Sequence, residues 1–207
     1  IYAIDFSSHM LGAFEDLAHV GGVLYENDTE KIARFFNMMA GILKERKSLL
    51  QGGNYEQYVK THGVVLPAIL LVIDQYSAFR EKTANAYEDI LIQLSRDGAS
   101  YGIYLLISSA GFGPSEIQSR IGDNIRTVIC LEMGDKFQYS EAMHISHLEV
   151  LPEAGVKGRG LALCPSGVLE FQTALCLEAQ DDYSRNEEII RECQAMNESY
   201  TGRRARP

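Results

Sequence analysis

The sequence has no long hydrophobic run. Its longest apolar stretch, Val64 to Ile73, has ten residues and contains Pro67, whereas a helix that crosses a bilayer needs about 20 apolar residues. No signal peptide is visible at the start of the chain. We therefore expect no direct membrane insertion of this segment, although a larger parent protein can be anchored through other parts.

Closely spaced metal-binding cysteines are also missing. The four cysteines are Cys130, Cys164, Cys176 and Cys193. None forms a C-x-x-C pair or stands at zinc-ligand spacing from a histidine. Cys130 and Cys164 lie in apolar runs, where a thiol acts as a small hydrophobe. This cysteine usage favours a reducing, cytosolic compartment.

The chain lacks an excess of positive charge, since its formal net charge is −9. A domain that grips nucleic acid through phosphates usually carries a basic face, so the acidic balance lowers the expectation of a DNA partner. The basic end formed by Arg203, Arg204 and Arg206 is interpreted as a solvated tail or a linker.

What the chain does contain is the apolar material of one compact domain. Its 207 residues are 46% apolar and 23% charged, as in soluble globular proteins. Strand-like and helix-like patterns alternate, which predicts an α/β fold with a mainly parallel central sheet flanked by helices. The expected strands are Tyr2–Phe6, Ile69–Ile73, Ile103–Ile107 and Thr127–Leu131, and the expected helices are Thr29–Leu50, Tyr87–Arg96, Pro114–Arg120 and Phe137–Met143.

The last part of the sequence changes character. Leu161–Leu163 and Leu169–Ala174 flank a turn at Ser166-Gly167, which predicts a hairpin on the edge of the sheet. A final helix is expected at Glu187–Met196. We therefore predict a core over residues 1–177, followed by a C-terminal helix and basic tail over residues 178–207.

Polar residues follow three of the predicted strands: Asp5, then Asp74 with Gln75, then Ser108 with Ser109. In open parallel sheets, ligands bind at the carboxyl ends of the strands. Ile-Leu-Leu-Val-Ile-Asp, which ends at Asp74, has the form of a Walker B strand, whose aspartate holds Mg²⁺ through water. A buried strand that ends in a helix-capping aspartate is an equally good interpretation.

Gln75 stands where an active ATPase of this kind places a second acid. Glutamine can orient a water molecule but cannot take its proton. A GTPase-like use of this glutamine is one interpretation, and weakened or lost hydrolysis is the simpler one.

The phosphate-binding motif G-x-x-x-x-G-K-S/T does not occur in the 207 residues. The pairs Gly21-Gly22 and Gly52-Gly53 lack the lysine that would follow and are interpreted as turns. Without a loop of amides and a lysine, a site cannot cradle phosphates well. We expect the missing strand, loop and helix to precede Ile1, and hence the chain to be a fragment.

Five stretches, together with the Walker-B-like strand that lies between the third and the fourth, resemble the part of FtsK/SpoIIIE motor domains that follows the phosphate loop, and they occur in the same order. The five stretches are Ile4–Phe6, Leu17–Val20, Leu43–Arg46, Gln93–Leu105 and Asp123–Arg126. The likeness runs from Ile1 to about Leu177 and implies a RecA-like P-loop NTPase fold that binds ATP and Mg²⁺. Gly158–Leu161 followed by Glu170–Gln172 is most similar to the tandem ATPase domains of the type VII secretion proteins EssC and EccC.

The resemblance implies a role for each candidate site residue. Asp74 would meet Mg²⁺ through water, and Ser108 would help to bind the nucleotide. Gln75 would face the attacking water, and Ser109 would face the γ-phosphate. Arg126 is the best candidate for an arginine that acts on a neighbouring subunit's site, with an ordinary surface arginine as the alternative.

The function implied is an ATPase module of a type VII (ESX/WXG100) protein secretion motor, which binds nucleotide or regulates its neighbours and hydrolyses weakly. The implied partners are the other ATPase modules of the motor, in a hexamer in the full assembly, and a secreted WXG-type substrate, at the cytoplasmic face of the cell membrane. Two alternatives stay open: a DNA-translocating FtsK/SpoIIIE ATPase, and a pseudo-ATPase that binds the signal peptide of a secreted substrate.

Overall fold

The computed structural model describes residues 1–164 and 166–205. These residues form two compact units. The first consists of Ile1–Ala110 together with the segment that begins at Ala179, and the second is Gly111–Glu178. Each unit has its own sheet, and each is described by itself below.

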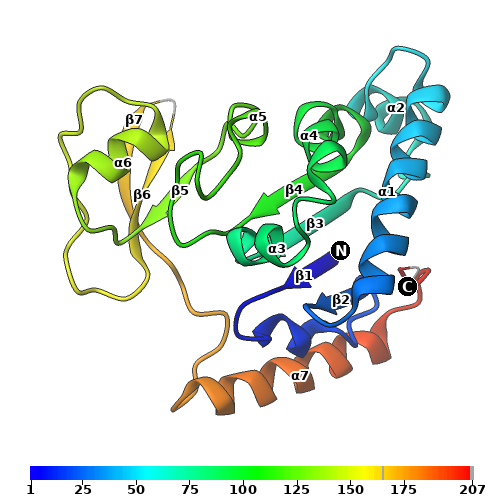
Figure 1. Cartoon of the computed structure of the whole chain (residues 1–207). Coiled ribbons are helices and arrows are strands. Elements are labelled where there is room, and N and C mark those ends of the chain that lie inside the picture. The colour runs from blue at the N-terminus through cyan, green and yellow to red at the C-terminus, as the bar shows by residue number, and fades with distance from the viewer. Residues whose placement is uncertain (165, 206–207) are drawn as a thin grey trace. The chain divides into compact units, whose positions relative to one another are not determined.

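The first unit is built on a parallel four-stranded sheet. Its strands are β1 (Tyr2–Asp5), β2 (Gly22–Tyr25), β3 (Ile69–Asp74) and β4 (Ile103–Ile107), in the spatial order β2-β1-β3-β4 (Figure 1). The predicted α/β fold with a parallel sheet is therefore confirmed. The turn expected at Gly21-Gly22 is wrong in part, because Gly22 opens β2 and pairs with Tyr2.

Helical elements flank this sheet. The helical elements are η1 (Met10–Phe14), α1 (Thr29–Leu50), α2 (Tyr55–His62), α3 (Tyr76–Lys82), α4 (Glu88–Asp97) and η2 (Gly98–Tyr101). Alternation along the strands puts Tyr2 and Ile4 on the same face, and the Tyr2 ring lies 5.3 Å from that of Phe35 in α1. Phe36 of α1 in turn stacks on Tyr87 at 4.4 Å. Aromatic packing thus joins the sheet to α1 and to the start of α4.

The C-terminal segment returns to the first unit. Helix α7 (Asp182–Ser199) runs along η1 (Figure 1). The side chain of Asn197 accepts a hydrogen bond from the Ala18 amide at 2.7 Å and donates one to the carbonyl of Asp16. The amide of Ala205 donates to the Ala18 carbonyl at 2.8 Å. The predicted final helix is thus longer than expected, and backbone contacts hold the start of the tail after it.

The second unit contains an antiparallel sheet in the order β5-β6-β7, made of β5 (Ile129–Leu131), β6 (Arg159–Cys164) and β7 (Gly167–Gln172). The predicted hairpin is formed by β6 and β7, but it pairs with β5 in this separate antiparallel sheet and does not lie on the edge of the parallel sheet as predicted. Helix α6 (Lys136–Met143) contributes Tyr139, Ala142 and Met143 to the core beneath this sheet. The helix expected at residues 114–120 is wrong, because α5 covers only Ser119–Gly122.

Strand β4 is an edge strand of the parallel sheet, with no partner on its outer side among the described residues. Tyr104 and Leu106 lie on the same face of this strand and are 44% and 55% exposed. The other edge strand, β2, has the buried Val23 at its centre. An apolar strip with unpaired backbone groups therefore remains open along β4.

Within the part of the chain that the structure describes, no helix combines the length and the apolar character that crossing a membrane would need.

Candidate functional site

The carboxyl ends of β3 and β4 bring Asp74 and Ser108 together. Asp74 is the last residue of β3, and Ser108 directly follows β4. The Ser108 hydroxyl donates a hydrogen bond to Asp74 Oδ1 and accepts one from the backbone amide of Gln75 at 3.0 Å. Three of the predicted site residues thus form one hydrogen-bonded group.

Gln75 holds an unusual backbone conformation. Its φ and ψ are 59° and 63°, in the left-handed region, which costs a residue with a Cβ atom about 1–2 kcal/mol. Helix α3 begins at the next residue, Tyr76. The Gln75 side chain accepts a hydrogen bond from the Ser77 hydroxyl at 3.3 Å. Strain of this kind persists where surrounding contacts fix the backbone, and such places are often functional.

Asp5, the aspartate that ends the neighbouring strand β1, has a different role. It pairs in register with Asp74, but it is completely buried. Its carboxylate accepts hydrogen bonds from the backbone amides of Ser7, His9 and Leu11, at 3.0, 3.2 and 3.0 Å. These contacts fold the segment after β1 around the carboxylate. Asp5 is therefore a structural residue and is not open to a ligand.

The other two predicted site residues are Ser109 and Arg126. Ser109 is half-buried beside Ser108. Arg126 is exposed and belongs to the second unit. The roles assigned to Ser109 and Arg126 therefore stay predictions.

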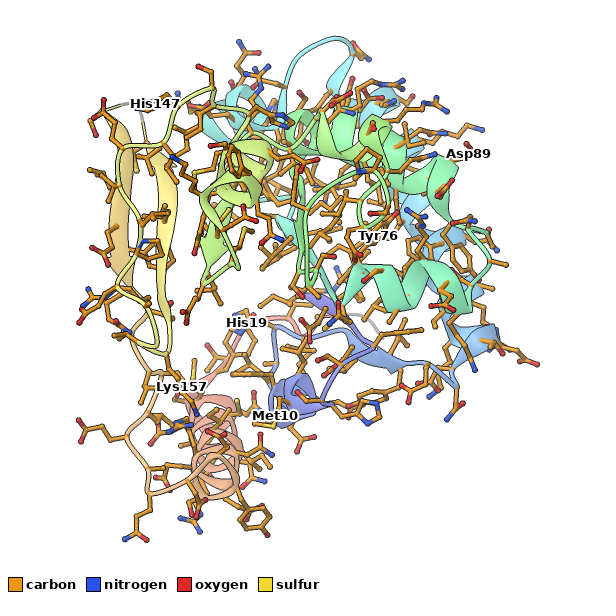
Figure 2. The ribbon with its side chains drawn as sticks, turned by 60° about the vertical axis from the view of Figure 1, so that its left-hand side comes forward. Met10, His19, Tyr76, Asp89, His147 and Lys157 are labelled. Carbon is orange, nitrogen blue, oxygen red and sulfur yellow. The ribbon has the colours of Figure 1, made fainter. Side chains whose placement is uncertain are left out.

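Tyr76 directly follows Gln75, its amide donates to the Ser108 carbonyl at 2.9 Å, and it was not singled out from the sequence. It is fully buried, and Figure 2 shows it among the packed side chains of the first unit. Burial raises the pKa of its phenol to about 12, and the nearby Glu88 adds to this effect. Among the described residues its hydroxyl has no hydrogen-bond partner. A lone tyrosine after a strand gives no sequence signal for such a position.

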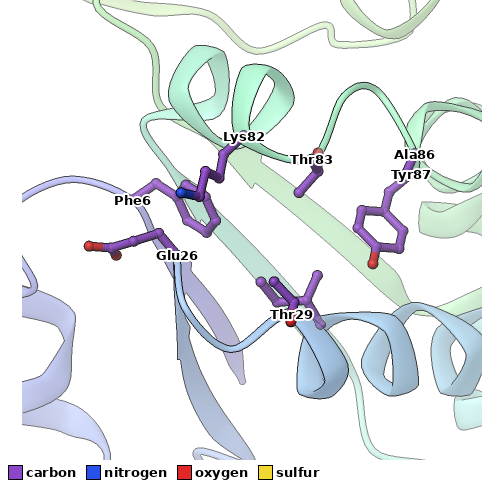
Figure 3. Close-up of a pocket in the computed structure, with 8 residues that line it drawn as sticks. Phe6, Glu26, Thr29, Lys82, Thr83, Ala86 and Tyr87 are labelled. Atoms are coloured by element: carbon purple, nitrogen blue, oxygen red, sulfur yellow. The ribbon is translucent and has the colours of Figure 1, made fainter.

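A small pocket of about 100 Å³ also lies in the first unit (Figure 3). Its lining is mostly apolar, and the charged side chains of Glu26 and Lys82 line one side. The eight lining residues are Phe6, Glu26, Thr29, Ile32, Lys82, Thr83, Ala86 and Tyr87.

The donors at Asp74 suit Mg²⁺ better than a tightly ligated transition metal. Mg²⁺ prefers oxygen ligands, keeps several waters and commonly binds through one or two carboxylates together with the phosphates of its nucleotide. Asp74 and Ser108 supply a carboxylate and a hydroxyl. The described residues contain no group of three or more His, Cys, Asp or Glu side chains that would enclose a metal by themselves, and His144 and His147 belong to none.

Comparison with known proteins places this geometry in context. No protein-family model matches the chain. The type VII secretion system protein EssC of Staphylococcus aureus (strain MRSA252) is 31% identical over 206 residues, which is 98% of this chain and 14% of that protein.

Two solved structures resemble the chain over its whole length. EssC (ATPases 2 and 3) from Geobacillus thermodenitrificans has a TM-score of 0.85 at 23% identity, and covers 99% of this chain and 39% of its own. Thermomonospora curvata EccC (ATPases 2 and 3), in complex with a signal sequence peptide, has a TM-score of 0.80 at 25% identity. The match covers 100% of this chain and 38% of the EccC chain.

The parallel sheet, the acidic strand end and these structural matches define a RecA-like α/β ATPase domain. Over 98% of its length the chain is homologous to the EssC/EccC ATPases of type VII secretion systems, as its sequence motifs predicted. It spans about 14% of the length of the EssC relative, so the activity of a whole secretion protein does not transfer to it directly.

Proposed function

We propose that this chain is an ATPase module of a type VII protein secretion motor, which binds Mg²⁺–ATP at the carboxyl ends of β3 and β4 and hydrolyses it weakly. The observation that carries this proposal is the group formed by Asp74, Gln75 and Ser108 on adjacent parallel strands. Asp74 holds the water shell of Mg²⁺, Ser109 contacts the γ-phosphate, and Arg126 acts on the site of a neighbouring module.

The phosphate-binding loop has to come from polypeptide outside the 207 residues, because they contain no G-x-x-x-x-G-K-S/T motif. The open edge of β4 supports a location for it. A parallel strand added beside β4 would end next to Ser108 and Ser109, so the loop after it would face Asp74. The helix expected after that loop would then be able to cover the apolar side chains of Tyr104 and Leu106 on the face of the sheet.

Weak hydrolysis follows from the chemistry of Gln75. A carboxylate at this position can accept a proton from the attacking water, whereas an uncharged amide cannot. The module is then suited to bind nucleotide and to regulate its neighbours. Its further partners are the other modules of the motor, in a hexameric assembly at the cytoplasmic face of the membrane, and a secreted WXG-type protein. The formal net charge of −9 does not favour DNA as the substrate.

A pair of matched substitutions tests the nucleotide site. In a polypeptide that supplies a phosphate loop, Asp74→Asn should weaken Mg²⁺-dependent binding of a fluorescent ATP analogue by at least about tenfold with little change in stability. Asp5→Asn, one strand away, should instead lower the free energy of unfolding by about 2 kcal/mol, since three amides lose a charged acceptor. Equal nucleotide affinity in wild type and Asp74→Asn would exclude Asp74 from the site.

A second substitution tests the reason for weak turnover. Gln75→Glu should raise the ATP hydrolysis rate by about 10²-fold, because it supplies a general base. Gln75→Asn, which keeps an amide, is the control and should leave the rate low. Brisk hydrolysis by the wild-type module would contradict the proposal.

A second candidate function is favoured by the EccC structure that contains a signal sequence peptide. In this alternative the module is a pseudo-ATPase that captures such a peptide, and the pocket of Figure 3 receives one apolar side chain. Binding of a labelled signal peptide should then persist without nucleotide and weaken on Ala86→Phe, which fills the pocket. Loss of peptide binding whenever ATP is removed would favour the first function.

A further inference from the structure

We propose that Ser108 is the positioning residue of this site: its hydroxyl orients the Asp74 carboxylate and holds Gln75 in the left-handed conformation. The consequence for metal binding rests on the proposed function, but the hydrogen bonds themselves do not.

Ser108 contacts four consecutive residues at the junction of β3 and α3. Its amide donates to the Ile73 carbonyl and its carbonyl accepts from the Tyr76 amide, both at 2.9 Å. Any residue at position 108 can make these two backbone bonds. The bonds of its hydroxyl, to Asp74 Oδ1 and from the Gln75 amide at 3.0 Å, require a serine or a threonine.

The hydroxyl has a single proton, and the bond to Asp74 uses it. Ser108 therefore cannot donate to a phosphate oxygen while this bond persists. With Oδ1 of Asp74 already accepting from Ser108, Oδ2 would be the oxygen more available to a metal-bound water. Residues that orient a metal-binding carboxylate in this way tune its affinity for the metal.

The same hydroxyl explains how a non-glycine residue is kept at position 75. In the left-handed conformation, with φ 59° and ψ 63°, the backbone amide of Gln75 donates its hydrogen bond to Ser108 Oγ. The acceptor compensates for the unfavourable backbone, and it sets the direction in which the Gln75 side chain leaves the chain. Orientation of both Asp74 and Gln75 thus depends on one oxygen atom.

Residue-resolved amide exchange in the 207-residue chain tests this assignment without any ligand. Ser108→Ala should accelerate exchange of the Gln75 amide about tenfold, since it loses its acceptor. The Tyr76 amide, which bonds to the backbone carbonyl of residue 108, should exchange at the wild-type rate and is the internal control. The carboxyl ¹³C resonance of Asp74 should also shift. Ser108→Thr retains a hydroxyl and should restore both signals.

Two outcomes would overturn the proposal. If Gln75 and Tyr76 accelerate together in Ser108→Ala, the serine only stabilises the whole turn. If the Gln75 amide or the Asp74 resonance is unchanged, the hydroxyl does not position that residue.

The metal-dependent consequence is measured in a polypeptide that also supplies a phosphate loop. There, Ser108→Ala should raise the Mg²⁺ concentration required for binding of the fluorescent ATP analogue by about tenfold. Binding without Mg²⁺ should be unchanged. An unaltered Mg²⁺ requirement in a protein that binds ATP would overturn the positioning role. Absence of any ATP binding in the wild type would overturn the proposed function, while the exchange and resonance results would still decide the hydrogen-bonding role of Ser108.

Discussion

Among single residues, Arg46 shows how a buried cation can stabilise a fold without an acidic partner among the residues that the structure describes. It is only 5% exposed. Its guanidinium donates hydrogen bonds to the carbonyls of Tyr101, Gly102 and Pro67, at 2.8, 3.1 and 2.7 Å. Burial lowers the pKa of this group from its ordinary high value. The three carbonyls lie just before β4 and β3, so one side chain of α1 fixes the starts of two strands.

Arg46→Met should therefore destabilise the first unit by about 3 kcal/mol, because three carbonyls lose their donors. Arg34→Met, on the exposed side of the same helix, removes only an ion pair with Glu30 and should change stability by less than about 0.5 kcal/mol. Urea unfolding followed by circular dichroism measures both. A similar loss for the two variants would contradict the role of the buried hydrogen bonds.

The candidate site was only partly predictable from its individual residues. Asp5 and Asp74 look alike in the sequence, since each ends an apolar strand. They differ because the segment after β1 curls three amides around Asp5, while Asp74 meets the Ser108 hydroxyl. That difference depends on tertiary contacts. Likewise, the sequence could not show which of Ser108 and Ser109 points at Asp74.

Between elements, Asp97 links the end of α4 to α1. Its carboxylate lies 2.6 Å from Lys47 Nζ of α1 and 2.8 Å from Arg96 Nε. The hydrogen bond from Arg96, assisted by Lys47, lowers the pKa of Asp97 to about 2. Folding therefore favours the ionised carboxylate, and this stabilisation is present at neutral pH.

The pH dependence has a definite sign. Because the folded pKa lies below the ordinary value of 3.8, the contribution is complete above about pH 4 and is lost as the pH falls toward 2. Asp97→Asn should cost about 1 kcal/mol at pH 7, allowing for solvent screening, and almost nothing near pH 2. Unfolding measured across this range, with Glu45→Gln as an exposed control, checks it. A cost that stays constant with pH would contradict it.

Element prediction succeeded where one local signal was strong. The apolar run Ile69–Ile73 gave β3, and the helical spacing after Asp28 gave α1 with the predicted bounds. It failed where tertiary structure decides. Strand β2 was missed because it is only four residues long and begins at the second glycine of the pair Gly21-Gly22, and α3 because it begins straight after a strand, through the left-handed Gln75.

In the whole molecule, the first unit is discontinuous in sequence, since α7 returns to η1 after the second unit. Replacing Gly111–Glu178 by a short Gly/Ser linker should therefore leave the first unit folded. The Ala18 amide, bonded to Asn197, should stay protected from hydrogen exchange, and Asn197→Ala in the same background should remove that protection. A shortened chain without a cooperative thermal transition would show instead that the two units depend on each other.

Sequence order alone could not give this arrangement. The prediction of a core over residues 1–177 with an appended helix assumed that each domain is one continuous stretch of sequence. The similarity to known motor domains, which also runs continuously along the chain, supported the same assumption. The docking of α7 depends on single contacts such as those of Asn197 with Ala18 and Asp16. A periodic pattern of apolar residues does not predict such contacts.

The open side of β4 has a practical consequence for work with the isolated protein. Two copies can join along Ile103–Ile107, since each presents amides and carbonyls that have no strand partner among the described residues, beside the exposed Tyr104 and Leu106. Dimers or precipitates whose amount grows with protein concentration would then result from pairing at the open edge of β4. Their stoichiometry should not be mistaken for the subunit count of a working motor.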